Sequence, residues 1–244
     1  MKYGILGDIH ANLCALEAVL AGLADAEVEV LLAVGDVVGY GAAPAACLDL
    51  LRQYEVAVVL GNHEQAVIEG AAAWGFNHAA LAAVSWTRDQ LSRTDRAWLA
   101  QLPLLRIFDH ALLAHASPAA EDGFPYVLNA ADADGALDGL SRPVCFVGHT
   151  HVPATFMRTV QDPVRTAISH DSFIDLSDTE LALVNVGSVG QPRDGDPRAA
   201  YAVYDSDRRT LRIERAVYDV EREAARITGA CLPASLAERL FVGR

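Results

Sequence analysis

Short apolar runs that end at a polar residue recur along this chain and constrain its fold more than any other feature. Near the start of the sequence, YGILG leads to Asp8, VLLAVG leads to Asp36, and VAVVLG leads to Asn62 and His63. Runs of this length that are rich in Val, Ile and Leu are typical of buried β-strands. The first 62 residues therefore predict three strands separated by two connecting segments.

The connecting segments predict two helices. In the first segment the apolar residues fall on one helical face, namely Leu13, Leu16, Val19, Leu20 and Leu23. The second, PAACLDLLRQY, has Pro44 near its expected start, where a helix tolerates proline. A β-α-β-α-β order predicts an α/β fold with parallel strands, whose carboxyl ends bring side chains together at one edge of the sheet.

Histidines follow two later apolar runs in the same way. ALLA leads to His115, and CFVG leads to His149 and His151, two imidazoles one residue apart that can converge on one point. The five strand ends together offer carboxylate, imidazole and amide groups, on Asp8, His10, Asp36, Asn62, His63, His115, His149 and His151. Each of these alone is explained by turn or capping chemistry, but jointly they predict a site for divalent ions such as Mn, Fe or Zn.

This set has too many donors for one ion, and it contains no thiolate of the kind that structural zinc sites use. Two ions that share these donors would each keep an open position. Such a pair, about 3.5–4 Å apart, can hold a hydroxide and clamp a phosphoryl group. The strand ends therefore predict a dinuclear catalytic centre.

The remaining segments indicate one domain over residues 1–244. Residues 64–101, which contain Trp74, Trp86 and Trp98, are rich in alanine and predict a helical insert. From residue 144 onward the chain predicts strands, followed by two helices near 219–228 and 234–241. No Pro-, Gly- or Ser-rich linker and no repeat divides the sequence.

Composition narrows the classes of partner and location. A net charge of −13 disfavours general nucleic-acid binding, but it leaves room for a small phosphorylated substrate if a cation lies in the site. No apolar run approaches the roughly 18 residues that a membrane span needs, and the N-terminus lacks a signal-peptide pattern. The cysteines at 14, 47, 145 and 231 lie among apolar neighbours, so we expect buried free thiols in a reducing cytoplasm.

In chain order, D-x-H, G-D, G-N-H-E, a single His and G-H-T-H resemble the signature of the calcineurin-like metallophosphoesterases. The resemblance runs from Asp8 to about Arg198, and five ordered motifs in matching strand context make it specific. GDVVGYG and VNVGSVGQPRDGDPRAAYAVYD are most similar to the small bacterial branch that includes the YfcE-like phosphodiesterases. The resemblance implies a four-layer α-β-β-α sandwich with two mixed β-sheets.

The resemblance also implies a role for each site residue. One ion would be held by Asp8, His10, Asp36 and His151. The other would be held by Asp36, Asn62, His115 and His149, with Asp36 bridging the two ions. His63 is similar to the residue that contacts the phosphate or leaving group without binding metal, so the implied catalytic residues are Asp36, Asn62 and His63.

Two features bear on the substrate. Gly39 and Tyr40 stand where protein Ser/Thr phosphatases and symmetrical dinucleoside tetraphosphatases carry an Asp-Arg pair, which disfavours both activities. Arg193 and Arg198 are candidates to bind phosphate, because a guanidinium fork suits phosphate oxygens, or they pair with neighbouring aspartates in a solvated loop. Tyr40 lines the pocket or packs under the following helix. The substrate-binding set is therefore Arg193, Tyr40, Asn62 and His63.

We expect a dinuclear metal-dependent phosphoesterase that hydrolyses a small phosphodiester, or a phosphomonoester, by attack of a metal-bridging hydroxide. Its two ions would be Mn, Fe, Zn, Ni or Co, with Mn favoured. The alternatives are a non-catalytic scaffold of the same fold and a hydrolase of cyclic nucleotides or dinucleotides. Three further histidines, His78, His110 and His170, are expected on the surface. The sequence leaves the oligomeric state open.

Overall fold

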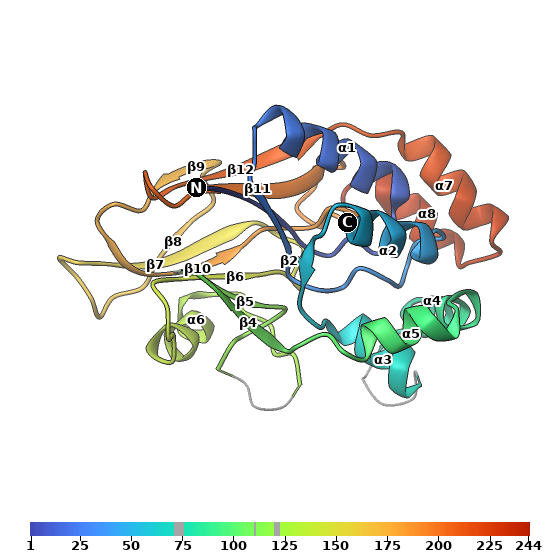
Figure 1. Ribbon diagram of the computed structural model, residues 1–244, viewed down its shortest axis with the longest axis horizontal. Helices are drawn as coiled ribbons and strands as arrows, with labels where there is room; N and C mark the ends of the chain where they lie inside the picture. Colours follow the sequence, from blue (N-terminus) through green and yellow to red (C-terminus); the bar gives the residue numbers. More distant parts are fainter. Residues whose placement is uncertain (71–75, 110, 120–122) are drawn as a thin grey trace.

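The computed structural model describes residues 1–70, 76–109, 111–119 and 123–244. These residues form two six-stranded β-sheets that lie face to face (Figure 1). The strand order is β3-β2-β1-β11-β12-β9 in the first sheet and β4-β5-β6-β10-β7-β8 in the second. Each sheet is mixed: β1, β2 and β3 are parallel in the first, and β5, β6 and β10 are parallel in the second.

The first sheet consists of β1 (Lys2–Leu6), β2 (Val30–Ala33), β3 (Ala57–Val58), β9 (Phe173–Asp175), β11 (Ala199–Asp205) and β12 (Thr210–Ala216). The second consists of β4 (Leu105–Phe108), β5 (Ala111–Ala114), β6 (Val144–Val147), β7 (Ala154–Thr159), β8 (Ala167–Ser169) and β10 (Thr179–Asn185). The predicted parallel β-α-β-α-β start is confirmed. The sequence did not predict the edge strands β4 and β8, because most of their residues are exposed and carry no alternating pattern.

The helices are α1 (Leu13–Asp25), α2 (Pro44–Gln53), α3 (Asn62–Glu69), α4 (His78–Gln90), α5 (Arg93–Leu99), α6 (Ala130–Asp138), α7 (Val220–Gly229), α8 (Ala234–Glu238) and the 3₁₀ turn η2 (Arg239–Phe241). Their starts follow capping rules. Asn12 caps α1 by accepting from the Ala15 N–H, and Pro44 occupies the first turn of α2. Helices α3, α4 and α5 occupy the expected insert, of which residues 71–75, including Trp74, lie outside the described residues.

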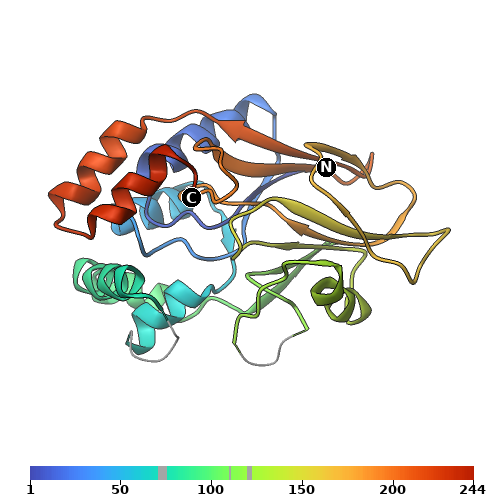
Figure 2. The same ribbon diagram turned by 180° about the vertical axis from the view of Figure 1, so that it is seen from behind.

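Three apolar cores hold four layers together, as the sandwich prediction requires. Between the sheets, Ile5 and Leu32 of the first sheet pack on Phe146 of the second. On the outer face of the first sheet, a core that includes Leu16 of α1 joins helices to strands. On the outer face of the second sheet, α6 covers a core that includes Leu183. The view from behind shows the same order of helices, two sheets and helices (Figure 2).

A fourth apolar cluster joins the C-terminal helices to α4. It contains Ala83 of α4, Ile227 of α7 and Leu236 of α8, and it includes Tyr40 from the loop after β2. The end of the chain therefore lies beside the carboxyl ends of the parallel strands. None of the helices in the described parts of the chain has the length and apolar content needed to cross a membrane.

The cysteines differ from expectation at one position. Cys14, Cys47 and Cys145 are buried free thiols as predicted, but Cys231 is an exposed free thiol. Cys231 follows the end of α7 with a positive φ of 57°, in a turn that directs the chain into α8. Its apolar neighbours in sequence face the cluster between α4 and the C-terminal helices, whereas the turn itself faces solvent.

Candidate metal centre

The parallel strands of both sheets end at the same edge of the sandwich, and the predicted ligands lie just beyond these ends. The first sheet supplies Asp8, His10, Asp36 and Asn62, and the second supplies His115, His149 and His151. All are buried, with at most 8% of any one exposed. The structure therefore brings every predicted ligand together, as the rule for carboxyl ends of parallel strands requires.

One group of donors lies around His151. Its Nε2 atom is 3.1 Å from Nε2 of His10 and 3.3 Å from Oδ1 of Asp8. Oδ2 of Asp36 is 3.7 Å from His10 Nε2. The ligand atoms of Asp8, His10 and His151 lie within 4.8 Å of one another, close enough to hold one ion.

A second group of donors lies around His115. Its Nε2 atom is 3.0 Å from Oδ1 of Asn62, 3.1 Å from Nδ1 of His149 and 3.2 Å from Oδ2 of Asp36. Because the same Asp36 oxygen also approaches His10, this carboxylate lies between the two groups. That is the position a bridging ligand needs.

Backbone carbonyls determine which nitrogen of three imidazoles carries the proton. The Nδ1 atoms of His10, His115 and His151 lie 3.0, 2.8 and 2.6 Å from the carbonyl oxygens of Val38, Val34 and Gln191. A carbonyl only accepts, so each Nδ1 carries a hydrogen, and each ring in its neutral form presents an Nε2 lone pair to the centre. This arrangement is the one that metal-binding histidines use.

The lone pairs then face one another with no hydrogen between them. His10 and His151, which are neutral because burial lowers the pKa of both, present two acceptor nitrogens 3.1 Å apart. Such contacts are repulsive unless a cation lies among the donors. The first group therefore fits a divalent ion as it stands, and the second group fits one once His115 gives up its Nε2 proton.

Electrostatics in the buried centre separate one histidine from the others. Burial lowers the pKa of His10 and His151, and it lowers the pKa of His149 to about 3. Burial also disfavours charge on His115, but the nearby Asp36 carboxylate outweighs it and raises the pKa of His115 to about 9. Metal binding must therefore displace a proton from His115, whereas the other rings are neutral at pH 7.

The loops that carry the ligands are tightly turned. Five of the predicted ligands have left-handed backbone conformations, with φ of 51° at Asp8, 47° at His10, 51° at Asp36, 69° at His149 and 62° at His151. Residues other than glycine rarely adopt this conformation, and it is found at functional sites where the surrounding structure enforces it. The fold therefore maintains strain at this centre.

Glu64 organises two of these loops, a role that the sequence alone did not predict. Its side chain is fully buried and accepts hydrogen bonds from the N–H groups of Asp36, Val38 and Gly61 at 2.8, 3.0 and 2.9 Å. Burial and the Asp36 charge raise the pKa of Glu64 to about 7, whereas the N–H donors favour its ionised form. The available signal was its place at the third position of α3, where a Glu side chain can reach back to the cap.

His63 lies at the mouth of the centre. Its ring is 4.7 Å from that of His10, 4.5 Å from that of Tyr40 and 4.8 Å from that of Phe76, between centroids. Its Nδ1 atom is buried without a hydrogen-bond partner among the described residues, and burial lowers the pKa of His63 to about 4. His63 is also close enough to His10 and Asp36 to join them at an ion, so the geometry allows both roles considered from the sequence.

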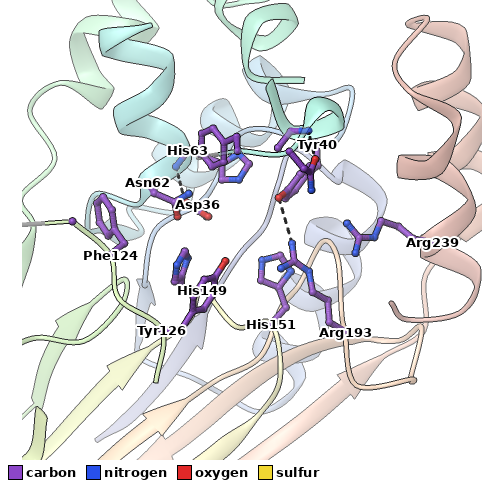
Figure 3. A pocket seen from close by; sticks show the side chains of 14 residues that line it. Asp36, Tyr40, Asn62, His63, Phe124, Tyr126, His149, His151, Arg193 and Arg239 are labelled. Carbon is purple, nitrogen blue, oxygen red and sulfur yellow. Dashed lines mark hydrogen bonds between the residues drawn. The ribbon is translucent and has the colours of Figure 1, made fainter. Parts of the chain in front are cut away.

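A pocket of about 450 Å³ opens over the centre (Figure 3). Asp36, Asn62 and His149 lie at its base, with Phe124 and Tyr126 on one side and Arg193 and Arg239 on the other. The ring of Tyr126 stacks on His149 with centroids 4.0 Å apart. The pocket therefore has an aromatic side and a cationic side, separated by the candidate ligands.

The candidate substrate-binding residues fall into two groups, those that line the pocket and one that faces solvent. Tyr40 and Arg193 line the pocket, and Nη2 of Arg193 donates to Tyr40 Oη at 3.4 Å. Arg198 instead is exposed and pairs with Asp196 at 2.6 Å, which is the solvated-loop alternative. His78 and His170 are exposed as expected, and His110 lies outside the described residues.

Residues 1–209 match the calcineurin-like phosphoesterase superfamily domain. The chain belongs to this superfamily. A Methanocaldococcus jannaschii protein, the uncharacterized protein MJ0912, is 33% identical over 245 residues, which cover 98% of this chain and 97% of the relative. The match to the superfamily domain covers residues 1–209, and the similarity to the relative covers nearly the whole chain, while placement beside the YfcE-like branch stays a prediction.

Solved structures agree with the fold of this calcineurin-like phosphoesterase. A metallophosphoesterase from Sphaerobacter thermophilus is 37% identical, with a TM-score of 0.87 over 100% of this chain and 99% of the other. The hypothetical protein PH1004 from Pyrococcus horikoshii is 16% identical, with a TM-score of 0.81 over 100% and 98% of the chains. The second similarity concerns the fold alone, and the first extends to a protein described as a metallophosphoesterase.

Several residues at the pocket of this phosphoesterase were not predicted from the sequence. Phe124, Tyr126 and Arg239 line it together with the predicted residues. Arg239 comes from η2, beyond the part of the chain that matches the superfamily domain. No motif marks these positions, because tertiary packing alone brings them to the strand ends.

Proposed function

We propose that this protein is a dinuclear metal-dependent phosphoesterase that hydrolyses small phosphodiesters. The observation that carries the proposal is the convergence of imidazole nitrogens and side-chain oxygens in two buried groups, with the Asp36 carboxylate between them. Family membership supports a hydrolase of phosphoesters, and the donor types suit Mn, Fe, Zn, Ni or Co.

In this proposal, Asp8, His10, Asp36 and His151 would hold one ion. Asp36, Asn62, His115 and His149 would hold the other. Divalent ions bound there would act as Lewis acids toward phosphoryl oxygens and would lower the pKa of water. The protein's own contribution is to fix these donors in a buried, strained setting, so that little reorganisation is needed when a substrate binds.

The residues around the pocket would orient the substrate. The Arg193 guanidinium would bind an anionic oxygen of the substrate, with Tyr40 holding the guanidinium in place. The neutral imidazole of His63 would direct its N–H to the leaving oxygen and assist its departure. Asn62, which lies at the base of the pocket, would contribute its side-chain amide oxygen to an ion.

A diester is favoured over a monoester because the pocket continues on both sides of the candidate ligands. A diester has two arms, and the sides lined by Tyr126 and by Arg193 could each receive one. The four free thiols, one of them exposed, suit the reducing cytoplasm that we propose as the location.

The test combines metal analysis with a panel of phosphomonoesters, phosphodiesters, cyclic nucleotides and dinucleotides, each assayed with several metals. We expect about two equivalents of metal and turnover of an activated diester. Asp36→Ala should lose metal and activity together, and His63→Ala should keep metal and lose activity with a poor leaving group. His78→Ala, which changes an exposed histidine, is the matched control. A metal-loaded protein inert on the whole panel would favour the scaffold alternative.

A further inference from the structure

Two arginines that pair with no Asp or Glu in the described parts of the chain face the same side of the pocket. Arg193 comes from the loop before β11 and Arg239 from η2 at the other end of the C-terminal region, and both side chains point toward Tyr40 (Figure 3). Among the described residues, no Asp or Glu carboxylate lies within 4.0 Å of either guanidinium. Arginines without an Asp or Glu partner are unexpected in a chain with a net charge of −13, because acidic side chains outnumber basic ones.

Other arginines of the chain have acidic partners. Arg198 pairs with Asp196, Arg215 pairs with Asp194, and Arg226 pairs with Glu223. Acidic residues are therefore available even near Arg193, but none turns toward it. Without an Asp or Glu partner among the described residues, the Nη atoms of the pocket arginines are left for an anionic ligand.

Arg193 is held by neutral acceptors only. Its Nη2 atom donates to Oε1 of Gln191 at 2.9 Å and to Oη of Tyr40 at 3.4 Å. Its Nε atom is buried and has no partner among the described residues. A buried unpaired donor on a guanidinium costs free energy, and an anionic oxygen would relieve that cost.

Arg239 is positioned by the cluster that docks the C-terminal helices. Leu236 and Leu240 on either side of it are buried in this cluster, and its Nε atom donates to the main-chain oxygen of Arg244, the last residue of the sequence. No protein acceptor takes its terminal nitrogens among the described residues, so they are available to the pocket. Burial and the charge of Arg193 both lower the pKa of Arg239, which places two like charges together in a partly buried setting.

We propose that Arg193 and Arg239 form a binding site for a second anionic group of the substrate, a phosphate or carboxylate on the arm that extends away from the scissile phosphate. This inference rests on the proposed function, in which the first phosphate lies at the candidate ligands. It narrows the substrate class to phosphoesters with at least two anionic groups. Arg239 is then a specificity residue supplied by the segment after residue 209, outside the matched superfamily domain.

Non-hydrolysable phosphonates test this directly. Alkylphosphonates and ω-carboxyalkylphosphonates of equal length, from two to five carbons, differ only in the second anion, and their P–C bond resists hydrolysis. Calorimetric titration of the metal-loaded protein should show that the carboxylate strengthens binding by at least about tenfold at one chain length, the factor expected for a charge-assisted hydrogen bond. Equal affinity of both series at every length would overturn the inference.

Variants test whether the preference for carboxylate-bearing phosphonates depends on Arg239. Arg239→Met should abolish the carboxylate preference while simple alkylphosphonates still bind, and Arg239→Lys should keep part of it. Arg222→Met, which removes an exposed arginine on α7, should keep the full preference, and thermal melting checks that each variant is folded. A folded Arg239→Met protein with the wild-type preference would contradict the assignment.

The same titrations separate this inference from the proposed function. If alkylphosphonates bind and diesters are hydrolysed but the carboxylate adds nothing, the second-anion site is wrong and the phosphoesterase stands. If the protein takes up no metal and binds no phosphonate, the proposed function fails, and the second-anion site fails with it.

Discussion

The Glu64 side chain holds the backbone of Asp36, with Oε2 accepting the Asp36 N–H at 2.8 Å and the Gly61 N–H at 2.9 Å. One buried carboxylate thus fixes the loop after β2 against the start of α3. Asp36 in turn accepts the N–H of His63 at 2.9 Å. The candidate bridging ligand and the candidate catalytic histidine are therefore positioned by the same network.

Glu64→Gln tests this network. The substitution keeps the shape but replaces one acceptor oxygen with an NH₂ group, which cannot accept from the Val38 or Asp36 N–H. We expect unfolding free energy to fall by about 1–3 kcal/mol, because a buried donor is left unpaired, and metal affinity to fall as the loop loosens. Urea unfolding and metal titration measure the two effects. Unchanged values in both would show that Glu64 does not organise the centre.

Asp8→Asn tests whether Asp8 binds metal without being needed for folding. Both carboxylate oxygens of Asp8 lie 3.0–3.1 Å from the His149 N–H, and Asn keeps one acceptor there while losing the charge. At a metal concentration of 100 times Kd, wild type should gain about 2.7 kcal/mol per site. The variant should gain clearly less, with similar stability in chelator. Melting curves of both proteins, recorded with chelator and with Mn, check this prediction. Equal metal-dependent shifts in wild type and variant would contradict it.

The sequence predicted the ligands well because each is local to a strand end. Asp8, Asp36 and His115 each follow a short buried run, and parallel strands bring such positions to one edge without further information. The motifs therefore encode both the secondary structure and the site. For the same reason the parallel start of the chain was predicted from periodicity alone.

The unpredicted parts of the site depend on contacts between distant segments. Arg239 reaches the pocket only because α7 and α8 pack on α4, and nothing in the local sequence marks that packing. Arg193 and Arg198 lie in one loop and looked equivalent, but only tertiary structure shows that Arg198 pairs with Asp196. Cys231 likewise differed from its buried neighbours through the turn that exposes it.

A buried carboxyl away from the centre predicts a pH effect on stability. The side chain of Glu223 is fully buried, and Oε1 has no partner among the described residues. Burial raises the pKa of Glu223 above its usual 4.5, against the Cys14 N–H and the Arg226 charge. The folded state therefore binds more protons than the unfolded state as pH rises from about 4.5, so this group's contribution to stability falls through that window.

Glu223→Gln should remove that pH dependence. The Gln side chain does not titrate, so the stability of the variant relative to wild type should rise as pH goes from about 4.5 toward neutrality. Urea unfolding of both proteins at several pH values measures the difference, and other groups cancel because the two share them. A difference that stays constant or falls with pH would show that Glu223 is not held above its ordinary pKa.

Gly39→Ala tests whether His63 acts in catalysis without mutating it. A Cβ atom on Gly39 would lie 2.1 Å from Nδ1 of His63, so the ring would have to move. Gly195→Ala is a matched control: its φ is +85° against +84° at Gly39, yet a Cβ there meets nothing within 4 Å. Left-handed strain should cost each variant about 1–2 kcal/mol of unfolding free energy. Only Gly39→Ala should lower kcat, with metal content unchanged, because only there is the imidazole displaced from the leaving group. Equal kcat values in the two folded variants would exclude a catalytic role for the position of His63.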